Sequence, residues 1–280
     1  MNPQRLYSEV CVECAQHITR RYSTSFSLGI RLFDPPLRDP IYAIYGFVRF
    51  ADEIVDTFHD HDKAALLGEF RADTYRAIAR RLSLNPVLQA FQEVVHEYGI
   101  ERDLIDAFLY SMELDIENRV YERALYDTYI YGSAEVVGLM CLRVFTRGEP
   151  GLYDELAAPA KRLGAAFQKV NFLRDISSDF HDRGRVYFPG VTFTRFSDAE
   201  KRAIEDEIAA DFEAALVGIR GLPRGSRLGV HCAFVYFRDL LRRIQRKEAR
   251  AIARERVRVP NYRKLGLMVG SAMQHRLNAL

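Results

Sequence analysis

Long hydrophobic runs are absent from this 280-residue sequence. A helix that spans a bilayer needs about 18 to 20 predominantly apolar residues, and the best candidate, 41–55, is interrupted by Arg49, Asp52 and Glu53. Charged residues also recur through the first turns of the chain, at intervals that the apolar core of a signal peptide does not tolerate. We therefore expect a cytoplasmic protein, with contact at the inner face of a membrane as an alternative.

A large net charge is absent as well. The sequence holds 40 Lys and Arg against 38 Asp and Glu, a formal net charge of +2, so charge alone indicates no polyanionic partner. Cysteine is scarce, and Cys11 and Cys14 form the only close pair among the four. Because a structural zinc site needs about four ligands at paired spacings, we predict no zinc site here.

Sustained alternation of apolar and polar residues, which is typical of half-buried strands, is also missing. Apolar residues instead recur three and four positions apart, and Gly and Pro separate the segments. No repeat, low-complexity segment or long linker divides the chain, so we predict an all-α, single-domain protein over residues 1–280 with about ten helices. The expected helices are 7–22, 41–56, 64–82, 86–98, 104–116, 126–145, 158–176, 199–219 and 228–253.

The segment 41–56 carries a polar stripe on an otherwise apolar helix. Tyr45, Arg49, Asp52 and Asp56 are spaced four, three and four residues apart, which places them on one helical face. A surface helix shows the opposite balance, a narrow apolar stripe and a broad polar face. We therefore expect this helix to be buried nearly all round, with its stripe turned toward an internal cavity.

A second stripe of the same construction consists of Gln168, Asn171, Asp175 and Asp179. Two ionised carboxylates one helical turn apart repel each other by roughly 3 kcal/mol at an effective dielectric near 20. Basic side chains are too few on these faces to balance four carboxylates, since only Arg49 is in phase. The pattern therefore predicts Mg²⁺, with Mn²⁺ as an alternative, bridging the two aspartate pairs to a diphosphate. A single Asp-x-x-x-Asp is common on solvated helices, so the prediction depends on the combination.

These motifs resemble those of the squalene/phytoene synthase family of head-to-head prenyltransferases. Residues 49–56 resemble its first aspartate-rich motif, and 168–179 resemble the second, which continues into 184–189 as in the family. Residues 22–26 are similar to its Ser-x-Ser-Phe flap, and 129–138 to its central motif. The resemblance covers about residues 10–265 and implies an isoprenoid-synthase-type helical bundle around a central cavity.

The resemblance also implies roles for individual residues. Glu53 stands where many members have Asp and receives no metal role, and Glu135 stands where Gly is usual, which leaves its role open. The implied metal ligands are Asp52, Asp56, Asp175 and Asp179, which together with Tyr129, Arg185 and Tyr187 form the catalytic set. The implied substrate-binding set is Ser23, Ser25, Phe26, Tyr45, Arg49, Gln168, Asn171, Tyr236 and Arg256.

The reaction that the resemblance implies is condensation of two geranylgeranyl diphosphates to phytoene through a cyclopropyl diphosphate, with release of diphosphate, a step of carotenoid biosynthesis. The length of the chain and its segment 184–189 resemble bacterial phytoene synthases, so NADPH is not expected. The missing dinucleotide fingerprint is weak evidence, because squalene synthases also lack an obvious one. The alternatives are a squalene or dehydrosqualene synthase acting on farnesyl diphosphate, and a non-catalytic assembly or scaffold protein of the same fold.

Two further patterns point to other classes of protein. Glu93 and His96 have the spacing of a di-iron carboxylate motif, but such sites need two of these motifs, and the second is missing. Residues 238–264 hold eleven Lys or Arg and three acids, which we interpret as the solvated face of a long helix. Within this segment Arg256 and Arg258 are candidates to close over diphosphate, and the remainder to attract an anionic membrane. No aromatic platform accompanies it, so no nucleic acid is expected, and no obligate protein partner is inferred.

Overall fold

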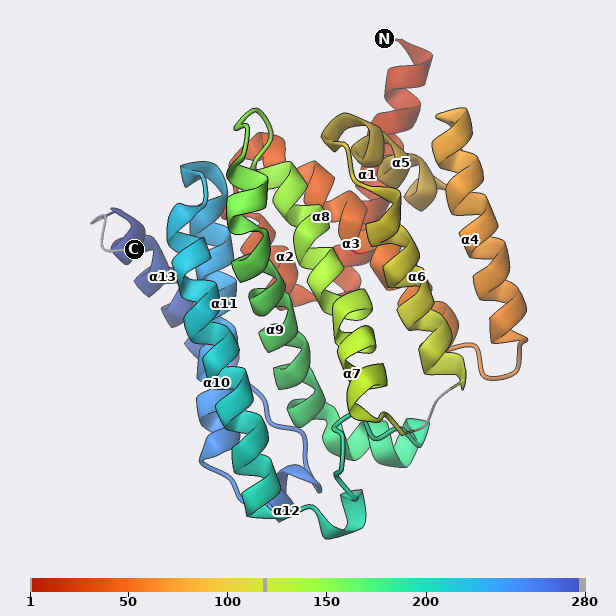
Figure 1. The fold of residues 1–280 in the computed structure, drawn as a ribbon. Helices are drawn as coiled ribbons and strands as arrows, with labels where there is room; N and C mark the ends of the chain where they lie inside the picture. Colours follow the sequence, from red (N-terminus) through yellow and green to blue (C-terminus); the bar gives the residue numbers. More distant parts are fainter. Residues whose placement is uncertain (1, 118–119, 277–280) are drawn as a thin grey trace.

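The computed structural model describes residues 2–117 and 120–276, and in these residues the chain is a bundle of α-helices (Figure 1). Outside the helices, the described residues contain one isolated parallel β-bridge, between Val120 and Val186. The all-α prediction is therefore confirmed. That residues 1–280 form a single domain stays a prediction.

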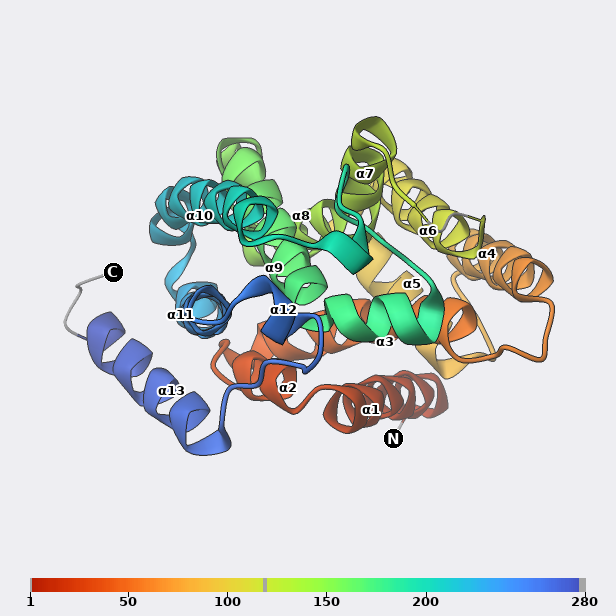
Figure 2. The same cartoon turned by 90° about the horizontal axis from the view of Figure 1, so that it is seen from below.

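The helices of the described residues follow one another with short connections. Their bounds are α1 Pro3–Tyr22, α2 Thr24–Ile30, α3 Pro35–Asp56, α4 Lys63–Arg80, α5 Pro86–Tyr98, α6 Arg102–Glu117, α7 Arg123–Ile130, the π-helix η1 Tyr131–Glu135, α8 Val136–Phe145, α9 Leu152–Arg183, the 3₁₀-helix η2 Phe193–Arg195, α10 Asp198–Gly221, α11 Arg224–Gln245, α12 Ala249–Ile252 and α13 Asn261–Arg276. Helices α4 and α13 lie at opposite edges of the bundle (Figures 1 and 2).

Local sequence signals explain several of the helix boundaries. Helix α5 begins where the Asn85 side chain accepts hydrogen bonds from the next turn, and it ends at Gly99, whose φ of 65° is in the left-handed region. Helix α10 begins with a complete capping box formed by Ser197 and Glu200. Helix α3 begins at Pro35, six residues before the start of the predicted helix 41–56. Proline at the first position is compatible with a helix start.

The structure differs from the predicted helices at two expected helices and at two helices that were not expected. The expected helix 126–145 is interrupted by η1, and the expected helix 228–253 ends at Gln245. Ala249 N donates to the Asp198 carboxylate at 2.7 Å, which ties α12 to the start of α10 and takes the chain out of line with α11. The basic segment 238–264 is therefore not one long helix. Helices α2 and α13 were not predicted.

The apolar residues form two cores. The first core joins α1, α3, α4, α5, α6 and α8, and includes the fully buried ring of Phe47, which stacks on Phe91 with 3.9 Å between centroids. The second core joins α7, α9, α10 and α11, and includes Phe212 and Phe234. Helix α3 thus belongs to the first core and α9 to the second. At the border between the cores, Arg185, which follows α9, binds Asp56 at the end of α3.

Glycines allow the central helices to approach each other closely. A Cβ on Gly164 of α9 would lie 2.6 Å from the backbone oxygen of Ala134 in η1, and one on Gly132 of η1 would lie 2.4 Å from the backbone oxygen of Ala107 in α6. Any side chain at either position would collide with backbone. The π-helix is therefore held between α6 and α9, directly after Tyr129. Single π-helical turns of this kind are frequent at functional sites.

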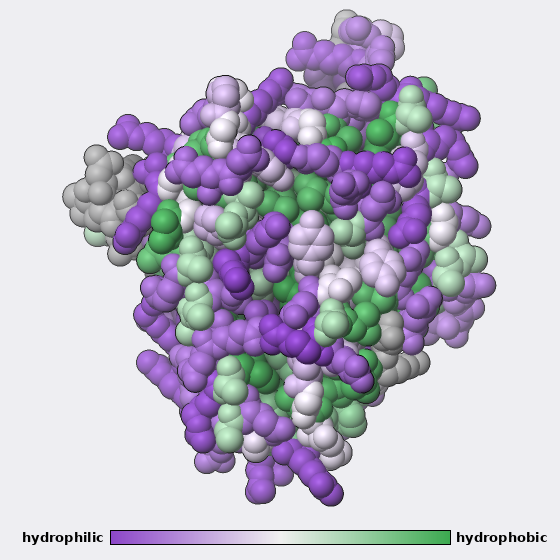
Figure 3. Space-filling model, in the orientation of Figure 1, coloured by the Kyte–Doolittle hydropathy of each residue, from purple (hydrophilic) through white to green (hydrophobic). Residues whose placement is uncertain are grey.

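The outer surface is mainly hydrophilic. Figure 3 shows that purple side chains cover most of the face seen in Figure 1, with smaller hydrophobic patches between them. Within the described residues, no helix combines the length and the apolar character that crossing a membrane requires.

Candidate active site

The first aspartate pair lies on the last turns of α3. Asp52 lies 3.6 Å from Nη1 of Arg49, and its side chain is 44% exposed although protein atoms surround it on most sides. Burial, followed by the neighbouring Asp56 carboxylate, raises the pKa of Asp52 to about 7. Asp56 accepts a hydrogen bond from Nη1 of Arg185 at 2.9 Å. The neighbouring Asp56 carboxylate thus opposes ionisation of Asp52, as expected for two acidic groups one helical turn apart.

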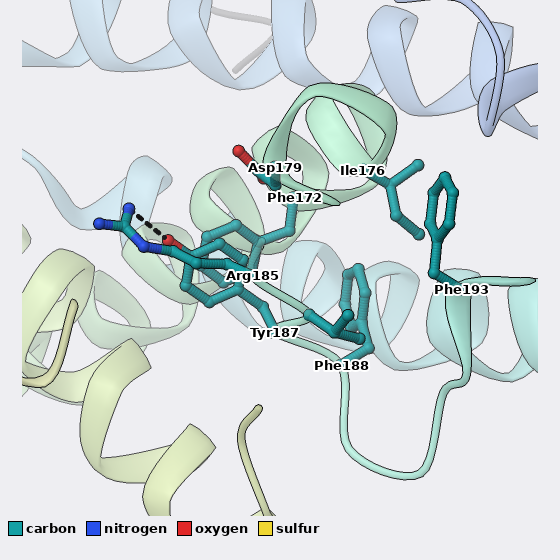
Figure 4. A pocket seen from close by; sticks show the side chains of 8 residues that line it. Phe172, Ile176, Asp179, Arg185, Tyr187, Phe188 and Phe193 are labelled. Atoms are coloured by element: carbon teal, nitrogen blue, oxygen red, sulfur yellow. Dashed lines mark hydrogen bonds between the residues drawn. The ribbon is translucent and has the colours of Figure 1, made fainter. Parts of the chain in front are cut away.

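The second aspartate pair lies in the C-terminal half of α9. Asp175 accepts from Nε of Arg174 at 3.0 Å, and its Oδ1 lies 2.6 Å from Nε of Arg256. Asp179, one turn further, is 8% exposed. In Figure 4 its side chain lies at one wall of a small pocket, next to Phe172 and close to Arg185. Asp175 therefore lies beside one guanidinium of its own helix and one that comes from beyond α12, and Asp179 lines the same pocket as Arg185.

The expectation that basic side chains are too few around the aspartates is wrong. Arg174, Arg185 and Arg256 lie against Asp56 or Asp175, in addition to Arg49. Arg185 follows α9, and Arg256 follows α12, so neither belongs to a helix that carries a stripe. Helical periodicity reports only neighbours on the same helix, which is why it underestimates the positive charge at this site.

The pocket of Figure 4 combines a charged end with apolar walls. Asp179, Arg185 and Tyr187 line it together with Phe172, Ile176, Val186, Phe188 and Phe193. The rings of Phe172 and Tyr187 stack with 3.9 Å between centroids and 3° between planes. Such a wall excludes water and presents π-electron faces, which stabilise cations.

A buried carboxylate that sequence reasoning missed lies behind this wall. Asp115, in α6, accepts hydrogen bonds from the hydroxyls of Tyr129 at 2.7 Å, Tyr121 at 2.9 Å and Tyr187 at 3.0 Å. The structure therefore joins the predicted residues Tyr129, Arg185 and Tyr187 in one network. Asp115 belongs to no aspartate-rich motif, so no local signal in the sequence identifies it.

The predicted N-terminal flap also forms, around the start of α2. Ser23 caps α2 by accepting from the Phe26 backbone N at 3.2 Å, and the Phe26 ring stacks on Tyr45 with 4.9 Å between centroids. The Arg49 guanidinium lies 4.4 Å from the centroid of the Tyr22 ring. Burial raises the pKa of Tyr45, and interaction with Arg49 opposes that shift. The flap residues are therefore held against the polar stripe of α3.

Two side-chain atoms of the stripes are buried without a hydrogen-bond partner in the described part of the chain, Oδ1 of Asn171 and Nε of Arg49. Unpaired buried polar atoms are costly, so they often mark places where a ligand binds. Tyr236 lies near Lys264, whose Nζ is 5.8 Å from the ring centroid. Gln168 and Ser25 are half-buried. The substrate-binding roles of Gln168, Ser25 and Tyr236 stay predictions.

The donor atoms present are compatible with magnesium. No three or more His, Cys, Asp or Glu side chains of the described residues form a cluster that would hold a metal ion by itself. Mg²⁺ does not require one, because it commonly takes one or two carboxylates, keeps several waters and completes its octahedron with substrate phosphate oxygens. The paired aspartate oxygens and the unpaired Oδ1 of Asn171 are the hard ligands that such a site uses. Metal binding by these residues stays a prediction.

Three residues with open or rival roles, Glu135, Glu93 and His96, have clear surroundings. Glu135 lies near Lys161, Arg162 and Lys169, basic residues of α9, rather than near the aspartates, and burial raises its pKa. In the di-iron alternative, Glu93 accepts hydrogen bonds from Ser8 and Gln89, and His96 contacts the backbone oxygen of Ile78. Glu93 and His96 thus make contacts that hold α1, α4 and α5 together.

Similarity to known proteins agrees with this arrangement. Residues 19–263 match the family described as squalene/phytoene synthase. A phytoene synthase of Rhodobacter capsulatus is 30% identical over 96% of this chain and 83% of its own length. A 15-cis-phytoene synthase of Synechococcus elongatus is 30% identical over 92% of this chain and 91% of its own length. A presqualene diphosphate synthase of Rhodopseudomonas palustris is 32% identical over 63% of this chain, and the match spans 62% of that protein.

Among solved structures, a dehydrosqualene synthase in complex with a ligand superposes with a TM-score of 0.84 over 100% of both chains, at 21% identity. A squalene synthase, HpnC, from Alicyclobacillus acidocaldarius superposes with a TM-score of 0.74 over 86% of this chain and 95% of its own, also at 21% identity. At these identities the likeness concerns the fold. The family match, by contrast, covers most of the sequence, including both aspartate-rich stripes. The chain therefore belongs to the squalene/phytoene synthase family, a family of prenyltransferases.

Proposed function

We propose that this protein joins two molecules of geranylgeranyl diphosphate head to head to form phytoene. The observation that carries the proposal is the hydrogen bond between Arg185 and Asp56, because it connects the aspartates of α3 with the pocket that Asp179 lines. Asp56 of α3 thus contacts a residue of the pocket, Arg185, and Asp179 of α9 lines the same pocket, whose other walls are largely aromatic. In the proposed complex the diphosphate would be held at the charged end and the prenyl chain would lie along the aromatic wall, since the pocket itself, about 10 Å³, is too small to enclose the chain.

The aspartate pairs Asp52 and Asp56, and Asp175 and Asp179, would hold Mg²⁺, or Mn²⁺ as an alternative. Bound there, the cation supplies positive charge that stabilises the departing diphosphate. The chain's own contribution to the same charge comes from Arg49, Arg174, Arg185 and Arg256, which lie against the aspartates. Arginine binds phosphate oxygens in a bidentate manner, so these side chains would also orient the leaving group.

The allylic cation that remains after diphosphate departs must be kept from water, because water captures it as an alcohol. The stacked rings of Phe172 and Tyr187, with Phe188 and Phe193 beside them, provide an apolar and electron-rich wall at the pocket. Loss of a proton then ends the sequence of steps that leads to phytoene, so NADPH is not required. The two relatives named phytoene synthase above match more than nine-tenths of this chain, which favours this product over presqualene diphosphate.

The product and the substrate are tested together by mass analysis. Purified protein is incubated with Mg²⁺ and either geranylgeranyl or farnesyl diphosphate, with and without NADPH, and hexane extracts are analysed. We expect a C40 hydrocarbon from geranylgeranyl diphosphate without NADPH, and loss of the product when EDTA removes the metal.

The other outcomes each favour a different alternative. A C30 hydrocarbon formed preferentially from farnesyl diphosphate would replace the proposal with a squalene or dehydrosqualene synthase. Accumulation of a cyclopropyl diphosphate alone would indicate that the reaction stops at the presqualene type of intermediate. No turnover of either substrate would favour a non-catalytic scaffold of the same fold.

We further propose that the protein binds the surface of an anionic membrane through α13, where a very apolar product can leave. Tyr262, Val269 and Met273 are 77%, 52% and 58% exposed and are spaced seven and four residues apart, so they share one face of this helix. Exposed arginines, Arg254 and Arg258, precede the helix. Apolar residues next to basic ones are typical of helices that lie in the membrane interface. Figure 2 shows α13 at the outer edge of the bundle, where a membrane can reach it.

Vesicle flotation tests this surface. We expect the protein to float with vesicles that contain phosphatidylglycerol and to remain unbound with pure phosphatidylcholine. Replacing Tyr262, Val269 and Met273 with Ser should reduce the bound fraction by roughly ten-fold or more, because each residue contributes buried apolar area. Val217→Ser is the matched control, since Val217 is 71% exposed on α10, away from α13. Equal flotation of the triple variant and the control would contradict the proposal.

A further inference from the structure

Asp115 is a carboxylate with an unusual set of partners. It is 7% exposed, and it accepts hydrogen bonds from three tyrosine hydroxyls that come from three different segments. Tyr121 precedes α7, Tyr129 lies in α7, and Tyr187 follows α9, with donor–acceptor distances between 2.7 and 3.0 Å. The carboxylate therefore connects segments that meet only in the folded molecule.

Arginine balances the charge of this carboxylate and connects it to the first aspartate pair. Nη2 of Arg185 donates to the backbone oxygen of Asp115 at 2.9 Å, and Nη1 lies 3.7 Å from its Oδ2. The same Nη1 donates to Asp56 at 2.9 Å. One guanidinium thus joins the buried carboxylate to an aspartate for which metal binding is predicted.

Of the tyrosines that Asp115 holds, Tyr187 lines the pocket together with Phe172, and Tyr121 and Tyr129 pack against Tyr187. Ring centroids lie 5.1 Å apart for Tyr121 and Tyr129, 5.2 Å for Tyr129 and Tyr187, and 3.9 Å for Tyr187 and Phe172. Burial, followed by the Asp115 carboxylate, raises the pKa of Tyr129 well above its ordinary value, so the hydroxyl keeps its proton. A neutral phenol that donates to a carboxylate has a more electron-rich ring, and ring electron density is what attracts a cation.

Apolar residues of similar volume would stabilise the fold at least as well as this charged network. Replacing buried ionic groups by well-packed apolar ones is often neutral or stabilising. What the network provides that apolar packing does not is a fixed orientation of the rings and an increased electron density on them. Both properties matter where a carbocation forms.

We propose that Asp115 is a positioning residue for the prenyl transfer reaction, which holds Tyr129, Tyr187 and Arg185 in the arrangement that stabilises the allylic cation. This inference rests on the proposed function. Asp115 acts through the tyrosines and Arg185, and it does not itself contact the substrate. Removal of the Asp115 carboxylate should therefore slow formation of the allylic cation more than it weakens binding of the intact diphosphate.

The test compares Asp115→Asn with Asp239→Asn. Asp239 is also buried, at 6% exposure, and is paired with Arg243 and Arg263 on the α11 side of the molecule, so it controls for the general effect of a buried amide. Two quantities are measured for each variant, the Kd of farnesyl thiolodiphosphate with Mg²⁺ and the single-turnover rate with geranylgeranyl diphosphate. The thiolodiphosphate ionises very slowly, so it reports binding alone.

For Asp115→Asn we expect a Kd within about three-fold of the parent, a single-turnover rate lower by roughly 10- to 100-fold, and a larger share of prenyl alcohol among the products. Asp239→Asn should keep both the parent rate and the parent product ratio. If Asp115→Asn does not fold, the double variant Tyr129→Phe, Tyr187→Phe removes two of the three tyrosine hydrogen bonds to Asp115 and keeps the rings, and it should also lose rate at unchanged Kd.

Three results would overturn the inference: a loss of binding in proportion to rate, an equal loss of rate in Asp239→Asn, or a double Phe variant with the parent rate. Failure of the proposed function is a separate result, because the parent protein would then form no C40 hydrocarbon from geranylgeranyl diphosphate. If it instead converts farnesyl diphosphate, the same comparison of Kd and single-turnover rate is made with that substrate, and if it converts neither substrate, the inference falls with the proposed function.

Discussion

Asp52→Asn and Asp175→Asn should each lower kcat/KM by about 10³-fold or more while the fold remains intact. Each substitution removes a carboxylate oxygen from one pair and so weakens the hold on the cation that neutralises the leaving diphosphate. The fold should tolerate both changes. Asp52 lies next to a like charge, so its removal relieves repulsion, and Asp175 is paired with Arg256, whose side chain is 51% exposed.

The measurement is steady-state turnover of geranylgeranyl diphosphate, with thermal unfolding as the check on the fold. Asp182→Asn is the matched control, because Asp182 is an exposed aspartate on the same helix as Asp175, one to two turns further along. It should retain turnover close to that of the parent. Normal turnover in either Asp52→Asn or Asp175→Asn would contradict the assignment of these residues to the metal site.

Arg185→Met is expected to damage both activity and stability. Arg185 is 7% exposed and is the cation closest to the Asp115 carboxylate, so its removal leaves a buried negative charge without its ionic partner. Breaking a buried pair in this way costs about 3–5 kcal/mol. For a chain of this size the corresponding fall in Tm is roughly 10 °C. Turnover should fall by about 10²-fold or more, since the link between Asp56 and the pocket is also lost.

Differential scanning calorimetry and turnover, measured on the same preparation, give both quantities. Arg195→Met provides the comparison, because Arg195 is an exposed arginine in the same connection, on η2. Its Tm and turnover should match those of the parent. An Arg185→Met protein with the parent's Tm would show that Asp115 does not depend on this guanidinium, and the network would need another explanation.

The sequence predicts the parts of this site that depend on helical periodicity. Spacings of three and four residues placed Tyr45, Arg49, Asp52 and Asp56 on one face, and α3 has apolar residues buried on its other faces. The all-α fold follows from the same periodicity over the rest of the chain. The helix starts expected at 86 and 199 lie within one residue of the observed ones, where Asn85 and Ser197 cap the helices.

What periodicity cannot report is contact between distant segments. Asp115 was missed because its three tyrosine partners are joined to it only by the fold, and Arg174 was missed because it is out of phase with the α9 stripe although its side chain turns back to Asp175. The charge balance at the aspartates was misjudged for the same reason, since Arg256 reaches them from beyond α12. The predicted helix 228–253 extended too far because a contact with another helix acts on its last residues. Asp198, from α10, binds the backbone N of Ala249.

The central claim is that one diphosphate binds between the aspartates of α3 and those of α9. A crystal structure of the protein with Mg²⁺ and farnesyl thiolodiphosphate tests it most directly. We expect metal density between the diphosphate oxygens and both aspartate pairs, with the prenyl chain along Phe172 and Tyr187. Diphosphate bound away from these aspartates, for example on the exposed arginines before α13, would contradict the account.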